Sequence, residues 1–200
     1  DKEDEFSLLQ IKPMTINSFN RSIIDNDINS KSLFCKSDIV LGEGLIDDIS
    51  HIIYVDIDNF DISQSNMIAY QIEELNKSLG PKNPYLLIGP GRWGSSDQWL
   101  GIPTSWEQIN NAKIIMELGI EGLEPDPSFG SHFFQNLTSL HLGYFTFNKK
   151  QTKNDINWDL LKETTTDTEK STNYVKLLKM KNPLKCIIDG TSGKGVILKK

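Results

Sequence analysis

The chain has 200 residues, 38% of them hydrophobic, which suits one domain with a real core, or one domain with an appendage. Its net charge of −6 argues against a general nucleic-acid binder. No apolar run approaches the roughly 18–20 residues that a membrane-spanning helix requires. The composition therefore predicts neither a nucleic-acid partner nor a membrane partner.

The first residues, DKEDEF, are acidic where a signal peptide is basic and apolar, so we expect a cytoplasmic protein. The chain does not begin with Met, and we expect it to be a piece of a longer protein. Cys35 and Cys186 lie far apart in apolar segments typical of strands. This setting favours buried thiols in a reducing cytosol over a disulfide or a metal pair.

The N-terminal half begins with a predicted strand within residues 1–16, followed by a polar linker at 17–31. Strands are expected within 32–46 and at 51–57. Apolar positions at helical spacing then predict a helix over 61–80.

Alternation of strands and helices continues through the middle of the chain. The apolar run 85–88 predicts a buried strand, and Thr104 with Glu107 fits a capping box at the start of a short helix. Further strands are expected at 112–120 and 140–147, with a short helix between them at 131–139.

The C-terminal part begins with a polar segment, predicted to be a mobile loop near 148–172 around one amphipathic turn. Strands joined by a glycine-rich hairpin follow. The hairpin sequence DGTSGKG (189–195) lacks the Ser or Thr after Lys194 that a phosphate-binding loop needs. The whole pattern predicts an α/β domain over residues 32–200, with α+β as the alternative, built on a mixed β-sheet flanked by helices.

The segment LLIGPGRWGSSDQWLGIP (86–103) contains the main candidate site. A buried-type strand that runs into glycines commonly exposes backbone N–H groups to an anion. Arg21 and Arg92 are the two arginines among 21 basic residues, and a guanidinium in this turn is typical of phosphate or carboxylate binding. The alternative is a structural turn whose arginine pairs with a neighbouring aspartate. The candidate ligand-binding residues here are Gly89, Gly91, Arg92, Gly94, Ser95, Ser96 and Asp97.

Three tryptophans, Trp93, Trp99 and Trp106, crowd the same region. They can form the wall of a ligand pocket or stack on a base. Tryptophans at this density are more typical of a core or an interface.

His132 follows Gly130 and Ser131, where the sequence predicts the start of a helix. The positive field of a helix N-terminus favours a neutral, nucleophilic imidazole and a nearby anion. His132 is therefore a weak catalytic candidate and a candidate ligand-binding residue. Gln135, one helical turn on, is expected to share its site, and a plain structural role for His132 is the alternative.

Asp56, Asp58 and Asp61 form an acidic group, but they lack the glycine and closing glutamate of a calcium-binding loop, which favours a solvated turn. No Cys/His spacing indicates zinc. His51 and His141 fall in predicted strands and are expected to be structural. No metal and no cofactor are therefore expected within this chain.

Two stretches carry a resemblance to a known family. FSLLQIKPM (6–14) resembles the closing strand of the ATP-grasp domain in phosphoenolpyruvate synthase and pyruvate phosphate dikinase. Gln10 matches a nucleotide-binding residue of that strand, and Lys12 replaces an arginine, which keeps the charge but loses the bidentate fork. GPGRWGSSDQWLGIPTSW (89–106) and DPSFGSHFFQNLTSLHLGYFTF (126–147) resemble the C-terminal region of phosphoenolpyruvate synthase-like proteins.

The resemblance implies that residues 1–16 end an upstream ATP-grasp domain and that 32–200 form a C-terminal accessory domain. It implies a parent phosphotransferase that uses ATP and magnesium, and a fragment that is not active alone. It also relates His132 to the phosphohistidine of these dikinases, although the flanking sequence HFFQNLT differs.

Three functions follow as hypotheses. The first is binding of a phosphate- or carboxylate-bearing ligand through the glycine-rich loop. The second is a non-catalytic module that docks the ATP-grasp domain or forms a homo-oligomer, with the tryptophans as its hot spot. The third is a hydrolase or transferase that uses His132 and Asp97.

Overall fold

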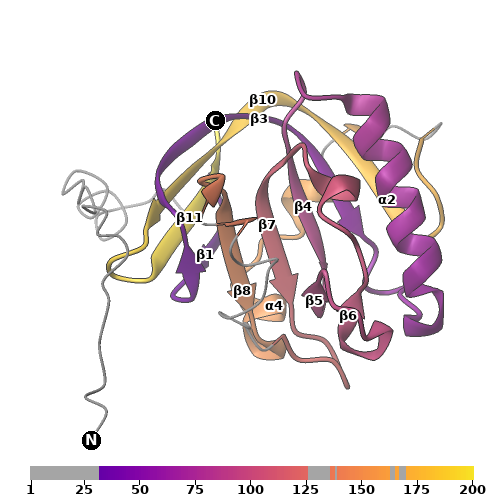
Figure 1. Ribbon diagram of the computed structural model, residues 1–200. Helices are drawn as coiled ribbons and strands as arrows, with labels where there is room; N and C mark the ends of the chain where they lie inside the picture. The colour runs from indigo at the N-terminus through magenta and orange to yellow at the C-terminus, as the bar shows by residue number, and fades with distance from the viewer. Residues whose placement is uncertain (1–31, 126–135, 138, 163–164, 167–169) are drawn as a thin grey trace, which may run out of the picture.

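The computed structural model describes residues 32–125, 136–137, 139–162, 165–166 and 170–200 (Figure 1). The strands of the large sheet are β1 (Leu33–Ser37), β2 (Val40–Leu41), β3 (Glu43–Val55), β4 (Tyr85–Pro90), β7 (Ala112–Leu118), β8 (Gly143–Phe147), β9 (Thr165–Thr166), β10 (Val175–Asp189) and β11 (Lys194–Lys199). A separate two-stranded pair consists of β5 (Arg92–Trp93) and β6 (Gly101–Ile102). The helices are α2 (Ser65–Leu79), α4 (Lys149–Asn154) and α5 (Asp159–Lys162), with 3-10 turns η1 (Ile62–Gln64), η2 (Gln98–Leu100) and η3 (Glu107–Ile109).

Within the described residues the large sheet has nine strands, eight of them in the order β1-β11-β10-β3-β4-β7-β8-β2, with β9 paired to β10. β3, β4, β7 and β8 run parallel to one another. β10 and β2 add antiparallel on the two sides of this parallel group. The predicted fold class, a single domain with a mixed sheet flanked by helices, is therefore confirmed.

The central strands β4 and β7 are nearly continuous apolar runs. All six residues of β4 are buried, and β7 has one exposed residue, Lys113, near its start. Parallel strands in the middle of a sheet are covered on both faces, so both sets of alternating side chains must be apolar.

The helix α2 connects β3 to β4 and covers one face of the sheet (Figure 1). Ile68, Ile72 and Leu75 are buried at helical spacing and pack against the sheet, as the predicted helix over 61–80 requires. Asn76 is a buried polar anchor at its end, where its Oδ1 accepts hydrogen bonds from Tyr85 Oη at 3.0 Å and from the Asn111 N–H at 3.1 Å. These bonds fix the helix to the start of β4.

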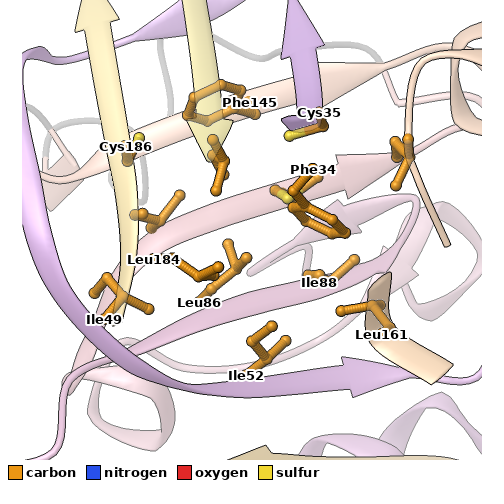
Figure 2. Close-up of a cluster of buried hydrophobic side chains, with 14 of the residues drawn as sticks. Phe34, Cys35, Ile49, Ile52, Leu86, Ile88, Phe145, Leu161, Leu184 and Cys186 are labelled. Atoms are coloured by element: carbon orange, nitrogen blue, oxygen red, sulfur yellow. The ribbon is translucent and has the colours of Figure 1, made fainter. Parts of the chain in front are cut away.

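The opposite face of the sheet has its own hydrophobic cluster, shown in Figure 2. Phe34, Leu86 and Phe145 come from three different strands and meet there, and Leu161 of α5 packs on them. The sheet thus separates two cores, one under α2 and one under α4 and α5.

The two ends of the strand order are close along the chain. β1 ends at Ser37 and β2 begins at Val40, so two residues connect the first strand of the order to the last. Ser37 Oγ donates a hydrogen bond to the Thr146 carbonyl of β8 at 2.9 Å, and the Thr146 N–H donates to the Ile39 carbonyl at 3.0 Å. The sheet therefore curls round so that its two edges approach each other.

Cys35 and Cys186 are both buried free thiols, as predicted. They lie on β1 and β10 and pair with Ile197 of β11 from its two sides, so one strand separates them. Two strand spacings are about 9–10 Å, which exceeds the reach of a disulfide. Burial raises the pKa of each thiol.

Two strands, β3 and β10, are longer than predicted. β3 runs over Glu43–Val55 rather than 51–57, and β10 is continuous over Val175–Asp189. The two pair along most of their length, with register shifts around Leu184. The predicted glycine-rich hairpin joins β10 to β11, where Asp189 Oδ1 accepts the N–H groups of Thr191 and Ser192.

The first part of the segment predicted to be a mobile loop near 148–172, residues 148–162, contains two short helices in the structure. It forms α4, which begins with a capping box between Asn148 and Gln151, and α5, which covers the predicted amphipathic turn. Leu160 and Leu161 are buried. A few apolar side chains in a polar stretch are enough to hold short helices once a sheet face is available to receive them.

The capping box predicted at Thr104 and Glu107 does not form, because the N-cap of η3 is Trp106, whose side chain makes no capping hydrogen bond. The Ser105 N–H donates to Gln108 Oε1 at 2.7 Å, at the start of η3. The Thr104 hydroxyl is buried and makes no hydrogen bond with the described residues.

Candidate functional site

The glycine-rich loop lies at the carboxyl ends of the parallel strands β3, β4, β7 and β8. In open α/β sheets this edge is where ligands usually bind, because loops leave the strands there and form a crevice. The loop itself follows β4 and forms the β5–β6 pair, in which Arg92 lies opposite Gly101.

The backbone N–H groups of this turn are used by the fold. The Gly91 N–H donates to the Leu118 carbonyl at 2.9 Å, and the Gly94 N–H donates to the Ile102 carbonyl at 3.1 Å. The Trp93 N–H donates to the Glu117 carboxylate at 3.0 Å. These three N–H groups are therefore not available to an anion, and the prediction of an N–H cradle is wrong at these positions.

The glycines are explained by close packing. A side chain at Gly89 would collide with the Trp93 indole, which lies across β4. Gly91 has a φ of 67°, and a Cβ there would lie 2.7 Å from the Leu100 carbonyl oxygen. The conformation and the contact both require glycine at position 91.

Glu117 is the unusual residue of the site, and sequence reasoning missed it. It lies on β7 in the apolar run AKIIMEL and is only 3% exposed. Its Oε1 accepts the Trp93 N–H, and its Oε2 accepts the Tyr144 hydroxyl of β8 at 2.6 Å. A lone acid in an otherwise apolar central strand is the signal that could have found it.

Burial raises the pKa of Glu117 to about 7, against the smaller opposing effects of the hydrogen bonds from Tyr144 and Trp93 and of the Arg92 charge. Burial also raises the pKa of the Tyr144 hydroxyl, and the neighbouring Glu117 charge raises it further. The Arg92 guanidinium is thus close enough to influence both groups. Strongly perturbed carboxyl groups of this kind gather at functional sites.

Arg92 is half-buried at the carboxyl edge of the sheet. The next residue, Trp93, donates its backbone N–H to Glu117, which places the Arg92 backbone next to the Glu117–Tyr144 pair, and the Arg92 charge lowers the pKa of both groups. The structure therefore brings Arg92 together with Glu117 and Tyr144, two residues that are distant in sequence.

The hydroxyls and the carboxylate after the loop serve the local turn. Ser95 Oγ accepts the Asp97 N–H at 3.1 Å, and Asp97 Oδ1 accepts the Trp99 N–H at 2.9 Å as the N-cap of η2. Ser96 is exposed. These residues hold the turn that follows Arg92.

The three tryptophans have different environments. Trp93 is buried and donates from Nε1 to the Met116 carbonyl at 3.0 Å, and Trp106 packs partly buried against the α2 side of the core. Trp99 is 59% exposed. Only Trp93 belongs to the immediate surroundings of Arg92 and Glu117.

Several predicted residues lie outside the described part of the chain. These are His132, Gln135, Gln10 and Lys12.

The other histidines and the acidic group have local roles. His51 lies buried on β3, whereas His141 precedes β8 in a turn with a φ of 54° instead of lying in a strand. Asp56 Oδ1 accepts the Asp58 N–H, and Asp61 Oδ1 accepts the Ser63 N–H. The described segments contain no group of His, Cys, Asp and Glu that could hold a metal ion.

No protein-family model, curated protein or solved structure matches this chain. None of the described helices is long and apolar enough to cross a membrane. The arrangement at the carboxyl edge offers a guanidinium and a carboxyl that titrates near neutral pH, which together can bind an anion and take up a proton.

Proposed function

We propose that this chain is the C-terminal accessory domain of a cytoplasmic phosphotransferase that resembles phosphoenolpyruvate synthase and pyruvate phosphate dikinase. In this proposal the domain binds a small phosphate- or carboxylate-bearing ligand with Arg92. The observation that carries it is the position of Arg92, half-buried at the carboxyl edge of the sheet and adjacent in the chain to Trp93, whose N–H binds the Glu117 carboxyl that also accepts the Tyr144 hydroxyl.

The position favours an anion for two physical reasons. A guanidinium in a partly desolvated site binds oxyanions in a bidentate manner and more strongly than an exposed one. The neighbouring carboxyl has a pKa of about 7, so near neutral pH it is protonated in about half of the molecules. An anion that binds next to Glu117 is expected to raise the fraction that is protonated, and to bind more tightly below pH 7.

The roles proposed for the two domains follow from the sequence resemblance. ATP and magnesium belong to the upstream ATP-grasp domain, which is the predicted partner of this domain. The fragment alone is proposed to bind its ligand without turnover.

The test is calorimetry and thermal-shift measurement with phosphate, pyruvate, phosphoenolpyruvate, AMP and ATP, with and without magnesium. We expect at least one of these to bind, and the substitution Arg92→Ala to weaken it by about tenfold or more, as for a charge-assisted hydrogen bond. Lys113→Ala, which removes an exposed cation at the opposite edge of the sheet, is the matched control and should bind normally.

The proposal fails if Arg92→Ala leaves every affinity unchanged while the variant remains folded. Arg92→Lys distinguishes charge from geometry, because it keeps the charge and loses the fork. Tighter binding at pH 6 than at pH 8 would add support for the coupling to Glu117.

The exposed apolar residues around η2 favour a second candidate function, docking to the ATP-grasp domain. Trp99 is 59% exposed, and Tyr70 on α2 is also 59% exposed. The Asn66 side chain of α2 donates a hydrogen bond to Gln98 Oε1 of η2 at 2.7 Å, so the two elements touch. Large exposed aromatic residues are typical of interface hot spots.

The docking function predicts association that Trp99→Ala removes. Sedimentation of the chain alone and mixed with the purified ATP-grasp domain measures this. Lys150→Ala, an exposed residue on α4, is the control. A strict monomer that binds small anions and ignores the ATP-grasp domain would exclude docking.

A further inference from the structure

A cavity of about 360 Å³ lies where β3 ends, between that strand end and the helices α4 and α5. It is lined by Tyr54, Asp56, Ile57, Asp58, Thr152, Lys153, Trp158, Leu161 and Lys162. Its volume falls within the range of small-molecule sites in proteins. None of these residues belongs to the Arg92 site.

The cavity and the Arg92 site are on opposite faces of the sheet. Tyr54 packs with the cluster under α4 and α5, whereas Tyr144 packs with the cluster under α2. Successive side chains of a strand point to opposite faces, so this separation is fixed by the register. Both sites lie at the same edge of the sheet, but the sheet separates them.

The body of the cavity is aromatic and aliphatic. Trp158 is held in place because its Nε1 donates to the Thr152 carbonyl at 2.9 Å. Trp158 and Tyr54 both pack partly buried against the hydrophobic cluster, and Ile57 and Leu161 extend this apolar surface. Such a lining receives the apolar part of a small molecule.

Thr152 lies in the wall of the cavity on the α4 side. Its side chain is 2% exposed, and its hydroxyl Oγ1 has no hydrogen-bond partner among the described residues. Its backbone N–H is occupied by the Asn148 carbonyl at 2.8 Å. The hydroxyl is closed off from the open space, so Thr152 forms part of the cavity wall and offers no hydrogen-bonding group to a ligand.

Charges of both signs reach the cavity from different elements. The carboxylates of Asp56 and Asp58 follow β3, and their charges add to the effect of burial in raising the pKa of Tyr54. The ammonium groups come from Lys153 of α4 and Lys162 of α5, of which Lys162 pairs with Asp159 at 3.0 Å.

The α4 side of the cavity has additional positive charge. An adjoining hollow of about 420 Å³ shares Lys153 and is also lined by Lys149, Lys150 and Glu124, with Lys149 paired to Glu121 at 3.2 Å, so cations outnumber the one acid of its lining. A ligand that matches both sides therefore presents a cation to the strand end and an anion to α4.

We propose that this cavity binds a zwitterionic small molecule with an apolar or aromatic body, of the class of free hydrophobic amino acids. The aromatic and aliphatic lining receives the side chain. The ligand's ammonium group faces Asp58, and its carboxylate faces Lys153.

The experiment is calorimetric titration of the chain with L-phenylalanine and with its two half-charged analogues. Phenethylamine keeps the ring and the cation, and 3-phenylpropionate keeps the ring and the anion. We expect each analogue to bind about tenfold more weakly than L-phenylalanine, because each loses one charged contact.

Single substitutions assign each contact. Lys153→Gln should weaken the binding of L-phenylalanine but leave the binding of phenethylamine unchanged. Asp58→Asn should also weaken the binding of L-phenylalanine but leave the binding of 3-phenylpropionate unchanged. Lys153 and Asp58 are exposed, so these two variants are expected to fold normally.

Two controls keep this site distinct from the Arg92 site. Arg92→Ala should leave L-phenylalanine binding unchanged, and Lys153→Gln should leave anion binding at Arg92 unchanged. The inference is overturned if L-phenylalanine, L-tyrosine and L-leucine produce no heat at millimolar concentration. It is also overturned if the analogues bind as tightly as L-phenylalanine, or if neither charge substitution changes any affinity.

Discussion

Glu117 illustrates how one buried side chain can organise a loop. Its two oxygens hold the Trp93 N–H and the Tyr144 hydroxyl, so the carboxyl ties the turn after β4 to β8. A carboxylate at 3% exposure loses most of its hydration, and two hydrogen bonds recover only part of that free energy. The raised pKa is the visible result of this imbalance.

The free energy of unfolding is therefore expected to depend on pH through Glu117. The pKa is about 7 in the folded chain and near the ordinary 4.5 when unfolded, so the folded state binds the proton more tightly. The Glu117 contribution is fully present below pH 4.5 and is lost as the pH rises to about 7, by about 3 kcal/mol. Urea unfolding at a series of pH values measures it.

Glu117→Gln is the informative variant, because its amide oxygen can accept the Trp93 N–H, its Nε2 can donate to Tyr144 Oη in place of accepting from it, and it does not titrate. The wild type should lose stability relative to Glu117→Gln between pH 4.5 and pH 7, and the difference should then stay constant. The pKa of His51 is lowered mainly by burial, so His51 changes the free energy of unfolding with pH in the opposite direction. Its contribution is the same in both chains and cancels when they are compared. Parallel stability curves for the two chains would contradict the assignment.

Among the elements, the turn between β4 and β5 depends on close contact rather than on flexibility. Gly91 has a φ of 67°, and a Cβ there would also lie 2.7 Å from Leu123 Cδ2. This contact brings the segment after β7 against the loop. The turn is therefore packed from two directions.

Gly91→Ala should destabilise the chain by about 2–4 kcal/mol, from left-handed backbone strain and from overpacking. Gly122→Ala is a matched control, because Gly122 has a φ of 77° and no atom lies within 4 Å of the added Cβ. Its cost should be limited to the backbone strain, about 1–2 kcal/mol. Chemical denaturation measures the free energy of unfolding of both variants. Equal losses would show that the close contact at Gly91 does not contribute to the effect.

The helices α4 and α5 show the same dependence on surroundings. Neither is long enough to be stable alone, since isolated helices shorter than about 12 residues are marginal in water. They persist because Leu160 and Leu161 bury against the sheet and the Trp158 indole bonds to the Thr152 carbonyl. Their packing also creates the cavity at the end of β3.

The molecule as a whole is organised by one sheet with two different faces. The curl that brings β1 and β2 near each other encloses the cluster of Figure 2, while α2 closes the other face. Because four parallel strands end at the same edge, their loops meet there on both faces. The Arg92 site and the cavity near Trp158 are consequences of this single arrangement.

The sequence was sufficient for features that depend on neighbours along the chain. Apolar runs such as YLLIGP and the spacing of Ile68, Ile72 and Leu75 correctly predicted a buried strand and its crossover helix. Asp189 and the glycines after it correctly predicted a hairpin. Arg92 was singled out by its rarity and by the turn around it.

Only the tertiary structure decided what surrounds Arg92 and what the glycines do. Residues 92, 117 and 144 meet because β4, β7 and β8 lie side by side, and no periodicity in the sequence encodes that strand order. The N–H groups expected to face an anion were instead taken up by Leu118, Glu117 and Ile102. Hydrogen bonding and burial depend on distances across the fold, so the local pattern could locate the site but could not specify its chemistry.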